Sequence, residues 1–389
     1  MSLPAKKLLI VSCSTGAGHF RAAEALRLTA QQLYPEAQVL HINLADYLSG
    51  PARIISISSY NPLTHKLPRF YKFIYYFSDI ALTQKFLYLI KPILRLGAKK
   101  FLKKVADYAP DRIVSTHFYP QLILPNHPSA PLDTVITDYH VHRIWLAPNV
   151  RNFFVASEDT KKELANLGIK SVAAGIPIYP SFSETKDISA LKIKLGINNN
   201  LPTVLILPIS RGQINAKQAV DAIFSRNKNI NVVAISGRDP APDSFWESMQ
   251  GKQHNYSAQG RKFIILKHAD NIDEWMRVAD IIVSKAGGLT ITEAIYLQKP
   301  LIIVNPIPGQ EDYNTAYLEK NRLGLNANSE NDLANKIQMI LANHDKTKTL
   351  YQSTLHQSKL GAGQELGTGQ ESRQNAGEII LKNIFAENV

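Results

Sequence analysis

Apolar residues occur along this chain in short runs, and these runs alternate with longer stretches in which apolar residues recur at helical spacing. A short apolar run bounded by turn-forming residues is typical of a strand that is buried on both faces, as in a parallel sheet. Strands that alternate with helices indicate α/β layers. The sequence therefore predicts an α/β protein with parallel sheets.

The predicted strands fall into two sets. The first set comprises Leu8–Ser12, Val39–Ile42, Arg112–Ser115, Thr134–Thr137 and Asn152–Ala156. The second set comprises Thr203–Leu207, Ile230–Ser236, Phe263–Leu266, Ile281–Val283 and Leu301–Val304. Helices are expected at Phe20–Leu33, Asp159–Leu167 and Ala376–Phe385. Residues Gln352–Gln374 are rich in Gly, Gln, Ser and Thr, which is typical of a loop.

A proline-rich stretch, Gly175–Phe182, separates the two sets. Its two prolines stiffen the chain and exclude a helix, so we expect a domain junction there. We expect an N-terminal domain over residues 1–178, a C-terminal domain over 179–365, and a tail with a terminal helix over 366–389. Two similar α/β domains commonly bind a ligand in the cleft between them.

Cysteine content and hydropathy limit the class of protein. Cys13 is the only cysteine among 389 residues, so no internal disulfide can form and a cytoplasmic location is expected. No apolar run approaches the length of a transmembrane helix. The run Leu8–Val11 is too short for a signal peptide and leads into a glycine-rich turn, so it is interpreted as the first strand.

The net charge of +12 is concentrated in one segment. Residues 66–104 hold ten Lys or Arg, one acid and nine aromatic residues. Basic and aromatic residues together suit an anionic membrane surface. The alternative is a helix over Phe86–Val105 that packs into a core, kinked at Pro92 and Gly97, with a solvated lysine face. No recognised nucleic-acid motif accompanies the charge, so no nucleic-acid partner is expected.

The segment Ser284–Asn314 has the most specific chemistry. A glycine pair, Gly287 and Gly288, follows an apolar run and precedes a helical pattern. Such a turn lets the backbone approach a phosphate, and the start of the helix offers free N–H groups and the positive end of its dipole. Glu293 lies about one turn into the helix, where a carboxylate can accept hydrogen bonds from sugar hydroxyls. The pattern favours a nucleotide-sugar diphosphate site.

This segment resembles the donor-binding core of the inverting glycosyltransferases that include MurG, the plant monogalactosyldiacylglycerol synthases and the bacterial processive diacylglycerol glucosyltransferases. It is most similar to the lipid-glycosylating branch. The resemblance implies the GT-B fold, with the acceptor on the N-terminal domain, a UDP-sugar on the C-terminal domain, and a terminal helix that crosses back. It further implies donor-binding roles for Gly287, Gly288, Thr290, Glu293, Gln310, Glu311 and Asn314. Asn314 has the alternative role of a helix-start residue.

Two further segments bear on the catalytic base. Gly16, Gly18 and His19 follow the first strand, and an imidazole there could accept the proton of an attacking hydroxyl. The alternative is a structural role, in which the segment is a tight turn and His19 only caps the helix. The family resemblance gives His19 an acceptor-side role, and we expect the helix dipole to keep it neutral. Asp138, after a strand of the same sheet, is the alternative base.

Other residues are assigned on the resemblance alone. The implied acceptor-binding residues are Gly16, Gly18, His117, His142 and Trp145. The implied donor-binding residues also include Ser210, Gly212, Gly237, Arg238, His268 and Ala269. Pro208 and Ile209 stand where relatives carry a glycine-rich loop, and this departure leaves the phosphate contacts open. His140 falls on a variable position and is expected to be structural.

The implied function is an inverting hexosyltransferase that moves a sugar from a UDP-sugar to a membrane lipid, with diacylglycerol favoured. No metal or other cofactor is expected, because this fold neutralises the leaving diphosphate with a helix N-terminus and basic side chains. The protein is expected to associate peripherally with the inner face of the cell membrane. Two alternatives stay open: transfer to another acceptor such as a lipid-linked saccharide, and a non-catalytic relative that binds nucleotide sugar or lipid.

Overall fold

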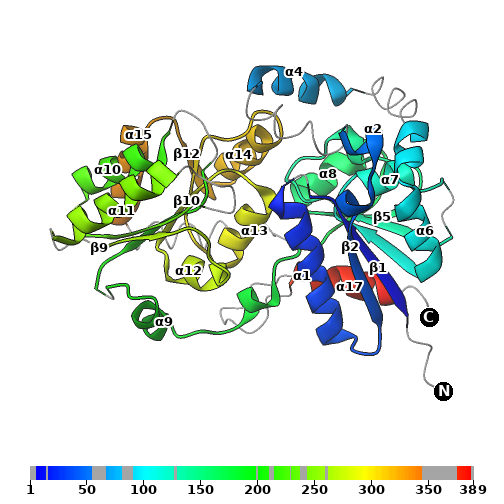
Figure 1. The fold of residues 1–389 in the computed structure, drawn as a ribbon, viewed down its shortest axis with the longest axis horizontal. Helices are drawn as coiled ribbons and strands as arrows, with labels where there is room; N and C mark the ends of the chain where they lie inside the picture. The colour runs from blue at the N-terminus through cyan, green and yellow to red at the C-terminus, as the bar shows by residue number, and fades with distance from the viewer. Residues whose placement is uncertain are drawn as a thin grey trace. The chain divides into compact units, whose positions relative to one another are not determined.

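The computed structural model describes most of the chain (Figure 1). The described residues are 6–14, 16–54, 67–80, 91–126, 129–198, 200–209, 214–227, 229–236, 243–258, 262–343 and 375–386. The contacts divide them into two compact units. The first unit comprises Met1–Ser183, Pro308–Tyr313 and Lys359–Val389, and the second comprises Glu184–Ile307 and Asn314–Ser358.

The first unit contains a six-stranded parallel sheet in the order β2-β1-β3-β4-β5-β6. Its strands are β1 (Lys7–Ser12), β2 (Gln38–Asn43), β3 (Arg112–Ser115), β4 (Leu132–Val135), β5 (Val150–Val155) and β6 (Ser171–Ala173). Its helices are α1 (Ala17–Leu33), α2 (Gly50–Arg53), α4 (Pro68–Ser78), α6 (Lys99–Tyr108), α7 (Tyr119–Ile123), α8 (Glu158–Asn166) and α17 (Ala376–Ala386). Short 3-10 turns are η1 (Leu44–Tyr47), η3 (Arg143–Trp145) and η4 (Pro180–Ser183).

The second unit repeats this architecture with the strand order β12-β11-β10-β7-β8-β9. Its strands are β7 (Thr203–Ile206), β8 (Asn231–Ile235), β9 (Lys262–Leu266), β10 (Ile281–Ser284), β11 (Leu301–Val304) and β12 (Gly324–Ala327). Its helices are α9 (Ile188–Lys194), α10 (Ala216–Arg226), α11 (Asp243–Ala258), α12 (Ile272–Val278), α13 (Gly288–Tyr296) and α15 (Glu330–Ala342). Helix α14 (Gln310–Lys320) begins in the segment assigned to the first unit and continues in the second. The predicted α/β class with parallel sheets is confirmed.

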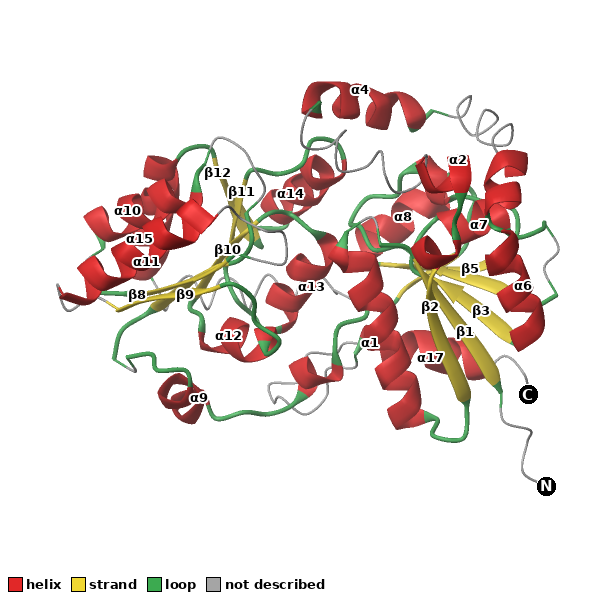
Figure 2. Cartoon of the chain, in the orientation of Figure 1, coloured by secondary structure: helices red, strands yellow, loops and turns green. Residues whose placement is uncertain are grey.

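Alternating side chains of β1 place two cores on opposite faces of the first sheet. Leu8 and Ile10 pack against α1 and α17, whereas Leu9 and Val11 pack with α6 and the loop after β2. Figure 2 shows α1 and α17 on one side of the sheet and α6 on the other. Residues Leu8 to Val11 of β1 are therefore buried on both faces of the sheet, which explains why this part of the strand is an uninterrupted apolar run.

The C-terminal helix α17 belongs to the first unit, as the family resemblance implied. Ile380, Leu381 and Ile384 are fully buried and share a core cluster with Leu26 of α1. Gly377 allows the close approach of the two helices, because a Cβ atom there would lie 3.0 Å from the Thr29 hydroxyl oxygen. A segment nearly 350 residues after α1 in sequence thus completes the first core.

Most strand boundaries match the sequence prediction within two residues, but two strands were missed. β6 and β12 have three and four residues, and both contain partly exposed or polar positions. The expected helix over Phe86–Val105 begins in part outside the described residues. Within them, a helical stretch over 91–97 is followed by a turn at Ala98 and then α6. Gly97 lies at this break, and a Cβ atom there would clash with Ala52 of α2 at 2.4 Å.

We predict that Ile380→Ala destabilises the first unit by about 2–5 kcal/mol, because it leaves a cavity under α17. Lys382→Ala is the matched control, since that side chain is 53% exposed on the same helix. Urea unfolding followed by circular dichroism measures both. Equal stability of the two variants would contradict the assignment of α17 to this core.

Candidate functional site

Three loops meet at one edge of the first sheet. β1 pairs with β3, and β3 pairs with β4, all in parallel, so the carboxyl ends of these strands lie side by side. Side chains that follow neighbouring parallel strands converge at this edge, where open α/β sheets bind ligands. His19 lies in the first turn of α1 after β1, His117 follows β3, and Asp138 follows β4. The structure therefore brings together three residues that the sequence assigned to the acceptor side.

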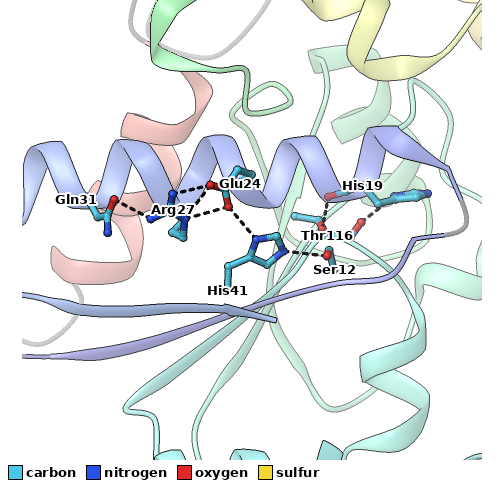
Figure 3. Close-up of polar contacts among 7 residues, drawn as sticks. All are labelled: Ser12, His19, Glu24, Arg27, Gln31, His41 and Thr116. Atoms are coloured by element: carbon cyan, nitrogen blue, oxygen red, sulfur yellow. Dashed lines mark hydrogen bonds and ion pairs between the residues drawn. The ribbon is translucent and has the colours of Figure 1, made fainter. Parts of the chain in front are cut away.

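His19 is oriented by two threonines, of which Figure 3 shows Thr116. Its Nδ1 atom lies 2.9 Å from the Thr116 carbonyl oxygen and 2.9 Å from the Thr137 hydroxyl. The Thr116 hydroxyl in turn donates to the His19 carbonyl at 2.8 Å. A carbonyl can only accept, so Nδ1 must hold the ring proton and Nε2 holds a lone pair. Nε2 has no hydrogen-bond partner among the described residues, so this nitrogen can accept a proton.

Burial lowers the pKa of His19 to about 4, and the hydrogen bond to the Thr116 carbonyl opposes this shift only in part. The imidazole is therefore neutral at physiological pH, as the sequence analysis expected. The expected cause was the dipole of α1, whereas the larger cause is removal of the ring from water.

Other predicted acceptor-side residues surround the His19 ring or shape its loop. The His117 ring packs edge-on against it with centroids 4.6 Å apart, and burial holds the pKa of His117 well below its usual value. The Trp145 ring is buried, with its centroid 6.1 Å from that of His19. Gly16 adopts φ +149°, a backbone conformation that favours glycine, and Gly18 is the second residue of α1. His117 and Trp145 therefore lie beside the His19 ring, and the two glycines belong to the turn and first residues that lead into α1.

A chain of polar contacts fastens α1 to the sheet just beyond His19. Glu24 of α1 accepts from Arg27 and lies 3.0 Å from Nδ1 of His41 on β2. Nε2 of His41 lies 2.9 Å from the Ser12 hydroxyl at the end of β1. Figure 3 shows this chain running from the helix to the strand. Ser12 is fully buried, so the contacts stabilise the β1–α1 turn and offer no accessible nucleophile.

Asp138 contacts a segment that comes from far along the sequence. Gln310 donates from Nε2 to Asp138 Oδ1 at 2.5 Å, and both residues belong to the first unit. Asp138 is 5% exposed, and Glu311, which follows Gln310 in sequence, is 4% exposed. Gln310, which the sequence analysis assigned to the hexose, thus forms a hydrogen bond with Asp138, the predicted alternative base.

His142 lies in the same loop, but both of its ring nitrogens contact protein. The Ile144 N–H donates to Nδ1 at 3.1 Å, so Nε2 holds the ring proton and donates to the Tyr75 carbonyl at 3.0 Å. The Ser78 hydroxyl also lies 3.2 Å from Nε2. His142 therefore attaches helix α4 to the loop, which favours a positioning role over direct contact with an acceptor.

His140 is held by two carboxylates. Its Nδ1 lies 3.1 Å from Glu163 Oε2 and its Nε2 lies 3.6 Å from Asp79 Oδ2. The ring stacks on Tyr313 with centroids 3.8 Å apart. Burial lowers the pKa of His140, but the two carboxylates outweigh burial and raise it to about 9. The structure gives His140 the structural role expected from the sequence, as a charged link between α8, the end of α4 and residue 313.

In the second unit, the glycine turn after β10 leads directly into α13. Gly287 is the N-cap and Gly288 is the first helical residue, so the first N–H groups of α13 have no partner within the helix. A Cβ atom added at Gly287 would meet no atom within 4 Å, and its φ of −72° is open to any residue. The fold therefore does not require glycine here, and the bare backbone leaves room for a ligand. Thr290 is partly exposed on this helix, and Glu293 is buried one turn later.

Two asparagines hold the loops beside this turn. Asn314 is fully buried and donates from Nδ2 to the Ala286 carbonyl at 2.9 Å, which favours the role of a positioning residue over sugar contact. Asn305 pairs with both backbone groups of Ile214, accepting at 3.0 Å and donating at 2.7 Å. Ile214 is the first described residue after the altered loop.

The structure describes only some of the remaining residues that were assigned to the donor. His268 is exposed after β9 and lies 2.9 Å from Asp270, and Ala269 follows it, partly exposed. Ser210, Gly212, Gly237 and Arg238 lie outside the described residues. Within the described ranges, no three His, Cys, Asp or Glu side chains form a group able to hold a metal ion. No helix in the described part of the chain has the length and apolar character needed to cross a bilayer.

Residues 19–178 match the family described as monogalactosyldiacylglycerol (MGDG) synthase, and residues 212–364 match the glycosyltransferase family 28 C-terminal domain. The processive diacylglycerol beta-glucosyltransferase of Bacillus subtilis (strain 168) is 26% identical over 403 residues, which cover 98% of this chain and 96% of the relative.

Two solved structures show the same fold over nearly the whole chain. MurG of Acinetobacter baumannii has a TM-score of 0.56 at 13% identity, covering 98% of this chain and 100% of that one. Anabaena HepE in complex with UDP-glucose has a TM-score of 0.52 at 14% identity, covering 98% and 99%. The predicted GT-B fold is confirmed.

We predict that the pH dependence of stability reports the charge on His140. Its pKa is raised on folding, so its contribution is complete below pH 6.5 and is lost as pH rises toward 9. Relative to His140→Gln, the wild-type protein should lose thermal stability across this window, by no more than about 3 kcal/mol. Scanning calorimetry at pH 6.5 and 9 measures the difference. Parallel melting temperatures for the two proteins would show that His140 carries no such charge.

Proposed function

We propose that this chain is a glycosyltransferase of the group represented by MGDG synthase and the family 28 C-terminal domain, and that it transfers a hexose from a UDP-sugar to diacylglycerol in a membrane. The observation that carries the proposal is that the N-terminal part of the chain matches the MGDG synthase family and the C-terminal part matches the family 28 C-terminal domain. The diacylglycerol acceptor is supported by the name of the Bacillus subtilis relative, and the UDP-sugar by the UDP-glucose complex of HepE.

The donor diphosphate would bind at the start of α13. Backbone N–H groups at Gly288 to Thr290 and the positive end of the helix dipole favour a phosphate group there. The space beside Gly287 lets the phosphate approach the backbone. Glu293 would accept from the ribose hydroxyls. Charge on the leaving UDP would be stabilised by these fixed groups, and no metal is needed in the proposed reaction.

His19 is the preferred base. As the lipid hydroxyl oxygen forms a bond to the anomeric carbon, the bond from that carbon to the UDP oxygen breaks, and the hydroxyl proton passes to Nε2 of His19. A single displacement of this kind inverts the anomeric configuration. Nε2 is neutral and unpartnered among the described residues, whereas Oδ1 of Asp138 already accepts from Gln310. This difference favours His19 over Asp138.

Helix α4 would bring the enzyme to the membrane. The side chains of Phe70, Phe73 and Phe77 are 53%, 64% and 56% exposed, and their spacing places them on one face of the helix. Exposed aromatic residues beside Arg69 and Lys72 suit the headgroup region of an anionic bilayer. The rest of the predicted membrane segment is described only over 91–104. We propose peripheral attachment at the inner face of the cell membrane.

The proposed reaction is tested with radiolabelled UDP-glucose and UDP-galactose on phosphatidylglycerol vesicles that contain diacylglycerol. We expect labelled glycolipid with one of the two donors, and less product on neutral vesicles. Gly287→Ala should fold normally but lower kcat/KM for the donor by about tenfold or more, because a methyl group enters the space left for phosphate. Absence of transfer from either donor, together with absence of UDP binding, would overturn the proposal.

The pH profile tests the role of His19. Because its pKa is about 4, the base stays unprotonated down to about pH 5, and kcat/KM should fall little between pH 7 and pH 5. A histidine with an ordinary pKa would cause a tenfold loss per pH unit below about 6.5. His19→Ala should lower kcat by about 10²–10⁴-fold. An acid limb centred near pH 6.5, or a fully active His19→Ala variant, would exclude His19 as the base.

A further inference from the structure

Helix α4 has a second face that contacts the site. The phenylalanines described above point away from the protein, whereas Tyr71, Tyr75 and Ser78 recur at the helical spacing of the opposite face. Tyr71 and Tyr75 are only partly exposed. The helix therefore presents phenylalanines to solvent, and tyrosines and a serine to the protein. An ordinary surface helix has the reverse arrangement, with its apolar face toward the protein.

The Tyr75 ring packs directly on the segment that holds Gln310. A Cβ atom added at Gly309 would lie 2.7 Å from the Tyr75 ring, and Gly309 has φ +92°, so both space and conformation require glycine there. The other neighbour of the ring is His142, with centroids 4.5 Å apart. Gln310, the residue after Gly309, donates to Asp138. Tyr75 thus lies between the loop of Asp138 and the segment of its hydrogen-bond partner.

Electrostatics agree with this placement. Burial is the largest cause that raises the pKa of Tyr71 to about 12, and the Asp138 and Glu311 carboxylates contribute to the same shift. The pKa of Tyr75 is raised by burial and then by Asp138. Both phenols are consequently neutral and lie close enough to Asp138 to sense its charge.

Further contacts hold the middle and the C-terminal end of α4. Lys72 lies 3.4 Å from Asp312, and the Tyr76 hydroxyl donates to the same carboxylate at 3.4 Å. At the helix end, Asp79 accepts from the Arg143 backbone N–H at 2.7 Å. The inner face therefore contacts the 309–313 segment and the 138–143 loop together, while the outer face is left exposed. None of these named contacts involves Phe70, Phe73 or Phe77, so a bilayer can bind these side chains without displacing those contacts.

We propose that Tyr75 is a positioning residue that holds Gly309 and Gln310 against Asp138, so that alignment of the Asp138–Gln310 pair depends on the seating of helix α4. The proposal rests on the transferase function proposed above. It implies that one helix serves both attachment to the membrane and the arrangement of the site, through opposite faces.

The test compares three variants. Tyr75→Ala removes the ring from the inner face, Tyr75→Phe keeps the ring and removes only the hydroxyl, and Phe73→Ser alters the outer face. Turnover is measured with the UDP-hexose and diacylglycerol vesicles of the transfer assay, and membrane binding is measured by flotation of the same vesicles. Hydrogen exchange of the peptide covering residues 308–313 reports whether that segment is held.

Tyr75→Ala should lower kcat by about tenfold or more, with flotation unchanged and with faster exchange over 308–313. Tyr75→Phe should stay within about threefold of wild type, because ring packing is kept. Phe73→Ser should lower flotation and turnover in proportion and leave the exchange unchanged. Unchanged exchange and turnover in Tyr75→Ala, or equal losses in Tyr75→Phe and Tyr75→Ala, would overturn the proposal.

These readouts separate the two proposals. If the wild-type protein makes no glycolipid, the transferase proposal fails, yet the exchange of residues 308–313 still decides whether Tyr75 holds that segment. If wild type is active and Tyr75→Ala matches it in both turnover and exchange, only the positioning role fails.

Discussion

Parallel pairing of β1 with β3 and of β3 with β4 is the constraint on which the rest of the first unit depends. This parallel pairing places three carboxyl ends at the same edge of the sheet, although Ser12 ends β1 and Arg112 begins β3 far along the sequence. His19 can contact both Thr116 and Thr137 because of this register. The network of Glu24, His41 and Ser12 then fixes the start of α1 on that edge.

The surroundings of two histidines near this edge shift their pKa values in opposite directions. His19 is removed from water and meets a carbonyl and a hydroxyl, so it is neutral. His140 is also largely removed from water, but it meets two carboxylates, so it is charged. Desolvation disfavours the charged ring in both cases, and the presence or absence of an opposite charge within a few ångströms decides the outcome. The neutral ring is suited to accept a proton, and the charged ring is suited to hold segments together.

The sequence predicted the fold well, because buried parallel strands such as β1 and β11 are uninterrupted apolar runs. It missed β6 and β12, whose short, mixed sequences resemble loops and whose pairing depends on their neighbours. Glycine and histidine motifs indicated candidate residues in each unit, but they did not reveal that Asn314 donates to the Ala286 carbonyl or that His142 contacts α4. Periodicity in α4 could have suggested a tyrosine face opposite the phenylalanines. The partner of that face, Gly309, is more than two hundred residues away and could come only from the structure.

Cys13 lies in the core of the first unit, where burial raises the pKa of its thiol to about 12. Thiol reagents attack the thiolate, so the sole native cysteine is protected twice, by lack of access and by lack of charge. A single cysteine introduced on the outer face of α4 would then be the one reactive thiol of an otherwise natural protein. Fluorescent or spin labels attached there could report whether this helix contacts a bilayer, without removal of any native residue from the core.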